Sequence, residues 1–457
     1  MMTQITQLND LDSGWAWQPW EPSEQEPWDR RRAALLLRRA GFGATESEIQ
    51  AALQKTPAEC IDRMFQIEGD ETAQFEVESS ELAASMIAGG EAKSLSIWWL
   101  HRMLHSPQHL LEKMTLFWHG HFATGAEKVL DPDLMLNQNK LLRRYALGDF
   151  RAMVHGIAKD PAMLIYLDSV TNRKAHPNEN FARELMELFC IGEGHYSEAD
   201  VQQLARCFTG WEIRRKNFRF NPYQHDSGMK QLLGTEVETG ESAIDQVLAH
   251  SKLPYFIVRK LFHFFVCDEP KPTDALLEPL ANQFASDGLS VSGVLKKILG
   301  SRLMLSNWCM ARKVRSPVEL SIGLMQTMQV TSNLAQLSNR LQEIGQALFF
   351  PPNVKGWDGG RAWVNSSTLV GRANLVYQLI RDDKTRFAGG SLNDWLQKQA
   401  ISESDAFLNW FSDLFLAVPI SDAQRMRLRK SIEGQSGDRM FREMISLLAA
   451  TPQFQLS

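Results

Sequence analysis

The sequence predicts a mainly α-helical protein with one large multi-helix body, a small irregular or β-ribbon insert and an irregular N-terminal arm. Through most of the 457 residues, apolar side chains recur at the three- and four-residue spacing of an amphipathic helix. Capping residues precede many of these stretches, and glycine often follows them. The pattern breaks in residues 211–234, where apolar and polar residues alternate briefly. These observations favour helices packed on helices, with strands confined to that break.

The N-terminal arm, residues 1–29, is too irregular for a helix and too apolar for a free tail. Two interpretations stay open: an arm docked on the body through its indoles, and an arm that binds a partner. The tryptophans concerned are Trp15, Trp17, Trp20 and Trp28.

Capping signals then mark the first helices. Asp29 precedes a predicted helix over residues 30–40, which Gly41 closes. Residues 45–48 form a capping box that opens the next helix. A short helix is expected after Asp160, because a proline follows this capping residue. Further helices are predicted within residues 95–117, 137–157, 178–190, 198–209, 242–303 and 317–349.

The predicted division of the chain follows from these patterns. The main body is expected to span residues 30–375, with the irregular insert at about 212–240. Residues 376–457 are expected to form a C-terminal helical subdomain packed on that body. A long segment without helix inside a compact body is often functional, so the insert is a candidate region.

Composition excludes several classes of protein. With 44% apolar and 23% charged residues, the chain is neither disordered nor fibrous. A net charge of -5 gives no bulk electrostatic reason to bind nucleic acid or an anionic membrane. No apolar run approaches the roughly 18 residues of a transmembrane segment. The five cysteines stand singly, which fits neither a disulfide framework nor a thiolate zinc site. In the absence of a recognisable export signal we expect a cytoplasmic location, and export by another route stays open.

Two histidines, His119 and His121, lie two positions apart in an apolar setting. Neutral imidazole is a common ligand of divalent metals, and Gly120 could let both rings turn toward one centre. The alternative is that each ring is hydrogen-bonded at a helix end. Spacing specifies no third ligand.

The predicted helix over residues 178–190 has an acidic face. At 100° per residue, Asn180, Glu184 and Glu187 fall within one wedge, opposite an apolar side. Arg183 can pair with Glu179 and Glu187 along the helix, whereas Glu184 has no basic residue at helical spacing. Glu184 therefore needs a partner from elsewhere if that face is covered, either in a structural ion pair or in a functional site.

Two further segments could carry chemistry. In the insert, His225, Asp226 and Lys230 could supply a general base, an orienting carboxylate and an anion contact, although Asp226 also suits an ordinary turn. Residues 351–360 form a proline- and glycine-rich loop, which Trp363 and Asn365 follow. The indoles of Trp357 and Trp363 could stack on a sugar ring, and Asn365 could contact the substrate. The alternative is that these tryptophans plug the end of the helical body. Motifs typical of nucleotide-binding proteins, zinc proteases and serine hydrolases do not occur.

Several of these stretches together resemble the bacterial domain of unknown function 1800 family. The resemblance runs over nearly the whole chain from about Arg30, and the acidic helix is its most specific part. The similar segments are residues 38–44 (RRAGFGA), 117–122 (FWHGHF), 161–168 (PAMLIYLD), 177–189 (PNENFARELMELF), 208–211 (FTGW), 225–230 (HDSGMK) and 351–357 (PPNVKGW).

The resemblance implies little about activity, because that family has no established one. Its members are often encoded beside proteins similar to sulfatases and alkaline phosphatases, and many are thought to be exported. The missing export signal departs from that expectation. The resemblance also implies that the histidine pair, the acidic helix and the His-Asp insert share a site.

Two hypotheses about function follow. The first is a metal-assisted hydrolase of a polar polymer or of its sulfated or phosphorylated fragments, with a divalent metal held by His119, His121 and Glu184. Glu187 or His225 would be the general base, with Asp226 beside it. Substrate contacts would come from Asn180, Arg183, Lys230, Trp357 and Asn365. The alternative is a non-catalytic helical scaffold or maturation partner of a sulfatase-like protein, using the N-terminal arm and residues 355–363 as contact surfaces.

Overall fold

A computed structural model describes residues 11–66 and 69–457. The predicted mainly α-helical class is confirmed, since helices α1 to α26 make up most of the described chain and strands form only three two-stranded antiparallel sheets. No helix in the described ranges is both long and apolar enough to cross a lipid bilayer.

The first half of the chain is helical up to the insert. Its helices are α1 (Ser13–Ala16), α2 (Arg30–Ala40), α3 (Glu46–Leu53), α4 (Pro57–Met64), α5 (Asp70–Ile87), α6 (Lys93–His105), α7 (His109–His121), α8 (Ala126–Val129), α9 (Pro132–Tyr145), α10 (Phe150–Ala158), α11 (Pro161–Tyr166), the short 3-10 helix η2 (Ser169–Thr171), α12 (Asn180–Glu184), the π-helix η3 (Leu185–Cys190) and α13 (Glu198–Cys207).

The insert consists of two hairpins, and helices resume after it. The hairpins pair β1 (Trp211–Arg214) with β2 (Asn217–Phe220) and β3 (Lys230–Leu232) with β4 (Thr235–Val237), with η4 (Pro222–Gln224) between them. The later elements are α14 (Gly240–Leu248), α15 (Leu253–Phe265), α16 (Asp274–Ser286), α17 (Val291–Leu299), α18 (Arg302–Leu305), α19 (Pro317–Thr327), β5 (Val330–Thr331), α20 (Leu334–Glu343), η5 (Gly360–Trp363), α21 (Ser366–Arg381), β6 (Arg386–Phe387), α22 (Leu392–Lys398), α23 (Ser404–Phe415), α24 (Asp422–Ser431), α25 (Gly437–Ala449) and α26 (Pro452–Gln455).

The local signals place the helix starts where they were predicted. The Asp29 side chain accepts a hydrogen bond from the amide of Arg32, and Thr45 closes a reciprocal capping box with Glu48. Asp160 caps α11 through the amide of Met163. The predicted stretch over 95–117 is instead divided between α6 and α7, because a proline follows the end of α6 and cannot continue it.

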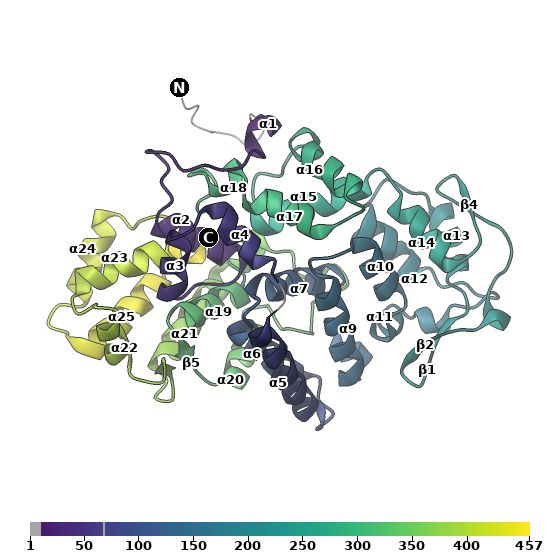
Figure 1. The fold of residues 1–457 in the computed structure, drawn as a ribbon. Helices are drawn as coiled ribbons and strands as arrows, with labels where there is room; N and C mark the ends of the chain where they lie inside the picture. The colour runs from purple at the N-terminus through teal and green to yellow at the C-terminus, as the bar shows by residue number, and fades with distance from the viewer. Residues whose placement is uncertain (1–10, 67–68) are drawn as a thin grey trace.

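The apolar core has two parts. One joins α1 and α7 with α10 to α18, and the other joins α3 and α6 with α19 to α25. In Figure 1 the C-terminal helices, drawn in yellow, lie beside α2 and α3, while the insert hairpins lie at the opposite end of the molecule. Helix α2 contacts α23 directly, so segments far apart in sequence share one core.

The described part of the N-terminal arm is docked on the body. Trp17 and Trp20 are buried, and the Trp17 indole donates a hydrogen bond of 2.6 Å to the carbonyl of Leu276. The amide of Trp20 bonds the carbonyl of Gly300. Of the two interpretations of this arm, docking through the indoles is the one that residues 11–29 follow.

Candidate functional site

The acidic segment contains a π-helix. Helix α12 passes directly into η3, where the hydrogen bond from the amide of Ile191 reaches back to the carbonyl of Met186. A π turn leaves carbonyls without their usual helical donors, and such turns occur often at functional sites. Here the Leu188 and Phe189 carbonyls accept from Lys260 Nζ at 2.9 Å and His121 Nε2 at 3.0 Å. Side chains of α15 and α7 thus hold the π turn.

His121 is committed to this structural role. Its Nδ1 accepts from Lys260 Nζ at 3.0 Å while its Nε2 donates to Phe189, so both ring nitrogens are occupied and the ring is neutral. Burial and the charge of Lys260 hold the pKa of His121 well below its usual value. Removal from water lowers the pKa of Lys260 to about 8.

His119 lies in a different niche. It is buried at the end of α7, and its Nε2 accepts a hydrogen bond of 3.1 Å from the amide of Phe349. Its ring packs edge-on against Trp99 at 5.0 Å between centroids. Burial lowers the pKa of His119 to about 3, so the ring stays neutral. This histidine fixes the chain just before the loop that carries Trp357.

The predicted metal site of His119, His121 and Glu184 is not assembled. Within residues 11–66 and 69–457, no three His, Cys, Asp or Glu side chains lie close enough together to hold a metal ion. The physical reason is that each imidazole is turned into its own packing niche and bonded there to backbone. The geometry instead follows the alternative prediction, in which each histidine ring is hydrogen-bonded at the end of a helix.

Glu184, at the end of α12, and Glu187, in η3, lie close enough for the charge of one carboxyl to act on the other. Glu184 is half-buried and makes no ion pair or side-chain hydrogen bond with any described residue. Burial and the neighbouring charge of Glu187 raise the pKa of Glu184, and the charge of Lys355 opposes them. Glu187 accepts a hydrogen bond of 3.0 Å from the hydroxyl of Tyr196. The two carboxyls therefore have different surroundings.

Tyrosine and lysine side chains complete the surroundings of this pair. Tyr166, at the end of α11, has a pKa raised by burial and by the charges of Glu127 and Glu184. Lys128 lies 5.9 Å from the centroid of the Tyr166 ring and forms an ion pair of 2.7 Å with Asp168. We call Glu184, Glu187, Tyr166, Tyr196 and Lys355 the acidic site.

The loop that carries Lys355 is seated on the end of α7. Gly356 has a φ of 77° and approaches Gly120 so closely that a Cβ added there would lie 2.1 Å from the Gly120 carbonyl oxygen. The ring of Trp357 packs at 5.7 Å from that of His119. The end of α7 therefore positions both sides of the acidic site, since His121 holds the π turn and His119 and Gly120 support the loop.

The other residues predicted for substrate binding at this end have local partners. Asn180 is exposed, and Arg183 pairs with Glu198 at 2.7 Å and Glu179 at 3.1 Å rather than with Glu187. Asn365 caps α21 by accepting from the amides at 367 and 368. Trp357 is half-buried against α7, which leaves part of its surface accessible.

The insert residues form their own network. The Nδ1 of His225 bonds the Thr209 carbonyl at 2.8 Å, and Asp226 pairs with Arg206 at 2.7 Å and caps its own turn. Lys230 is buried, with its amine donating to the carbonyls of Asp226 and Glu238. Within the described chain, no hydrogen bond or ion pair links this network to Glu184 or Glu187. The three insert residues are therefore bonded to α13, to the segment after it and to the insert itself rather than to the acidic pair.

Sequence reasoning missed Lys260, Tyr166 and Tyr196. Lys260 interrupts the apolar stretch of α15, and a lysine inside such a stretch is a signal that a buried acceptor lies opposite. Tyr166 lies in one of the segments that resemble the family, but its distance from Glu184 in the sequence did not indicate that the two side chains lie close together.

The comparison with protein families gives one result. The family model described as Protein of unknown function (DUF1800) matches residues 35–456. The chain belongs to this family. No curated protein and no solved structure gives a significant match to it. For this DUF1800 protein, function must therefore be argued from the acidic site itself.

Proposed function

We propose that this DUF1800 protein is a hydrolase acting on a polar polymer or its sulfated or phosphorylated fragments, with the acidic site as its active site. The observation that carries the proposal is the half-buried carboxyl of Glu184, which lacks a partner among the described residues and lies beside a second carboxyl. Buried carboxyls are normally paired, so an unpaired one next to a like charge favours a functional role.

The two carboxyls are suited to act as a general acid and a general base. Burial and the charge of Glu187 keep Glu184 protonated to higher pH, so it can donate a proton to the leaving oxygen. Glu187, held by the Tyr196 hydroxyl, would take the proton of the attacking water. The water oxygen forms a bond to the substrate atom as the bond from that atom to the leaving oxygen breaks. The leaving oxygen takes the proton of Glu184, and Glu187 holds the proton of the water.

The surrounding side chains suit an anionic, sugar-like substrate. Lys355 is exposed beside Glu184 and could contact a sulfate or phosphate group. The accessible part of Trp357 could stack on a sugar ring. No step in this proposal passes through a metal ion, because the imidazoles expected to bind one are bonded to Phe349, Phe189 and Lys260.

A panel of neutral, sulfated and phosphorylated oligosaccharides tests the proposal. The wild-type protein should release reducing ends or inorganic anion from at least one class, and Glu184→Gln and Glu187→Gln should each lower kcat at least about 100-fold. Glu236→Gln, at an exposed position of β4, is the matched control and should keep full activity. Full activity in both acidic-site variants would contradict the assignment.

One observation favours the second candidate, a scaffold or maturation partner of a sulfatase-like protein. Helix α21 exposes Leu369, Val370 and Tyr377, at 39%, 60% and 44% of their surface. If these residues bind a partner, Val370→Glu should abolish co-elution with a co-encoded sulfatase-like protein in size-exclusion chromatography. The acidic-site variants should leave that co-elution unchanged.

A further inference from the structure

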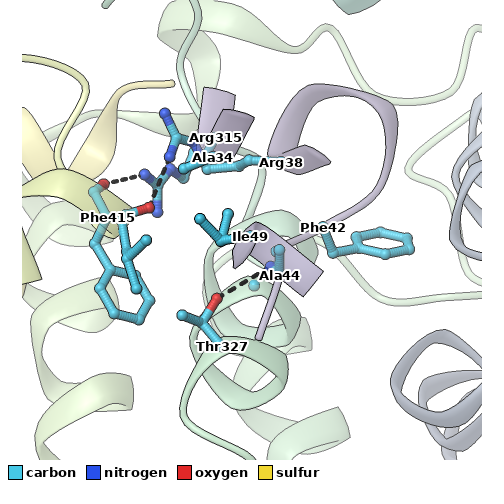
Figure 2. A pocket seen from close by; sticks show the side chains of 11 residues that line it. Ala34, Arg38, Phe42, Ala44, Ile49, Arg315, Thr327 and Phe415 are labelled. Carbon is cyan, nitrogen blue, oxygen red and sulfur yellow. Dashed lines mark hydrogen bonds between the residues drawn. The ribbon is translucent and has the colours of Figure 1, made fainter. Parts of the chain in front are cut away.

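A small pocket remote from the acidic helix carries two buried arginines. It lies between α2, the loop after it, α19 and the end of α23. Figure 2 shows the guanidinium groups of Arg38 and Arg315 together at one side of this pocket, near Ile49 and Phe415. Most of the remaining wall is apolar or backbone.

Both guanidinium groups are enclosed and incompletely hydrogen-bonded. Arg38 is 7% exposed and Arg315 is 2% exposed. Arg38 donates from Nε to the Ser457 hydroxyl at 3.2 Å and from Nη1 to the Leu414 carbonyl at 2.8 Å. Arg315 donates from Nε to the Leu456 carbonyl at 3.0 Å and from Nη2 to the Phe415 carbonyl. Nη2 of Arg38 and Nη1 of Arg315 have no acceptor among the described residues.

The charge of this pair is not matched by side-chain carboxylates of the described residues. Ser457, the last residue given, bonds Arg38 through its hydroxyl and the neighbouring Arg39 through its main-chain oxygen. In the described ranges, neither arginine forms an ion pair, and Glu319, which acts on Arg315 from a distance, is itself paired with Lys113. Burial and the charges of Arg315 and Arg39 lower the pKa of Arg38. Two buried cations with unused donors around one cavity need a counter-charge.

We propose that this pocket binds a monatomic anion, chloride under ordinary conditions, between Arg38 and Arg315. The enclosed part of the pocket has room for about one water-sized particle, and a chloride ion is only slightly larger than a water molecule. Sulfate and phosphate are too large for that space. The ion would accept from the unused N–H groups and neutralise part of the charge of the pair.

The bound ion would hold together parts of the chain that are distant in sequence. Arg38 belongs to α2, Arg315 precedes α19, and the carbonyls that hold them belong to the end of α23 and the segment after α26. Chloride would therefore stabilise the attachment of the C-terminal helices to the first part of the chain. This role is independent of the acidic site.

Thermal unfolding of the full chain tests the proposal, with sodium gluconate replaced by sodium chloride at constant ionic strength. We expect a saturable rise in Tm, about 1 to 2 °C at tenfold the chloride Kd. Bromide should act like chloride, whereas sulfate should give no specific rise. An equal rise with all salts would overturn the proposal.

Variants and crystallography locate the effect. Arg38→Met should lose the chloride dependence, whereas Arg429→Met, which removes an exposed arginine paired with Asp405, should keep it. A chloride response that persists in Arg38→Met would overturn the site. If Arg38→Met does not fold, anomalous diffraction from wild-type crystals soaked in bromide tests the site instead. An anomalous peak between the two guanidinium groups is expected, and a featureless map there would overturn the proposal.

Discussion

At the scale of single residues, the two histidines of α7 form a motif typical of metal ligands but serve to support the backbone. Each ring serves as a hydrogen-bonding support, one for the π turn and one for the loop that follows Phe349. Their spacing predicted that both imidazoles make polar interactions at the end of α7, but it did not predict which partner each ring nitrogen binds. That choice depends on Lys260 and Phe349, which are more than a hundred residues away in sequence.

Removal of His121 tests this support. His121→Ala should lower the free energy of unfolding by about 2 to 4 kcal/mol, because it leaves a cavity, an unpaired Phe189 carbonyl and a Lys260 amine that keeps only the Leu188 carbonyl as acceptor. Urea denaturation measures the loss. His176→Ala, at an exposed position, should change stability by less than about 0.5 kcal/mol. Similar losses in both variants would contradict the role of His121.

Asp160 should make stability depend on pH. Burial raises its pKa from 3.8 to about 7, against the hydrogen bonds from Met163 and Gln138 that favour the charged form. Because the folded state then binds the proton more tightly than the unfolded chain, Asp160 lowers stability as pH rises from about 4 to about 7, by on the order of 4 kcal/mol. Above pH 7 its contribution is constant.

Asp160→Asn isolates that contribution. The amide oxygen can keep both hydrogen bonds without a charge, so the variant should lose this part of the pH dependence and should be more stable than wild type at pH 8. Denaturation at pH 5 and pH 8 gives the comparison. Parallel pH profiles for the two proteins would show that Asp160 is not the group responsible.

At the scale of elements, features set by neighbouring residues could be predicted from the sequence, whereas features set by contacts between distant segments could not. Capping boxes fixed the starts of α3 and α13 because their hydrogen bonds join residues three positions apart. The π-helix η3 could not be predicted, since its freed carbonyls are satisfied by α7 and α15. Periodicity predicted that Glu184 and Glu187 lie together, and the charge of Glu187 does act on Glu184, but the spacing assumed an α-helix where η3 is a π-helix.

The loop that carries Lys355 offers a test of how α7 positions the acidic site. Gly356→Ala should destabilise the protein by about 2 kcal/mol or more and should impair substrate binding, because the new Cβ would meet the Gly120 carbonyl and displace the loop. Gly389 has a similar φ of 80° with no atom within 4 Å of an added Cβ. Gly389→Ala therefore measures the backbone strain alone, about 1 kcal/mol. Chemical denaturation should show the smaller loss for Gly389→Ala, and equal losses would mean that the contact with Gly120 carries no weight.

At the scale of the whole molecule, the two parts of the core are joined by helices that contribute to both. Helix α7 places Met114 in one part and Leu116 in the other, and α9 divides Leu142 and Leu136 in the same way. Between these helices lies the buried carboxylate of Glu112, which accepts from Arg102, Arg143 and the Trp99 indole. Burial would raise the pKa of Glu112, but the two arginines outweigh it and hold the value at about 2.

This sharing predicts that both parts of the core unfold in one cooperative transition. Differential scanning calorimetry should show a single peak, and Glu112→Gln should move the whole peak to lower temperature, with a loss of about 3 to 5 kcal/mol. The reason is that buried Arg143 loses its carboxylate partner and Arg102 keeps only Glu76. Asp405→Asn, which breaks an exposed ion pair with Arg429, should cost less than about 1 kcal/mol. Two separate peaks, of which only one moves in Glu112→Gln, would mean instead that the C-terminal helices unfold independently, as the predicted subdomain over 376–457 would.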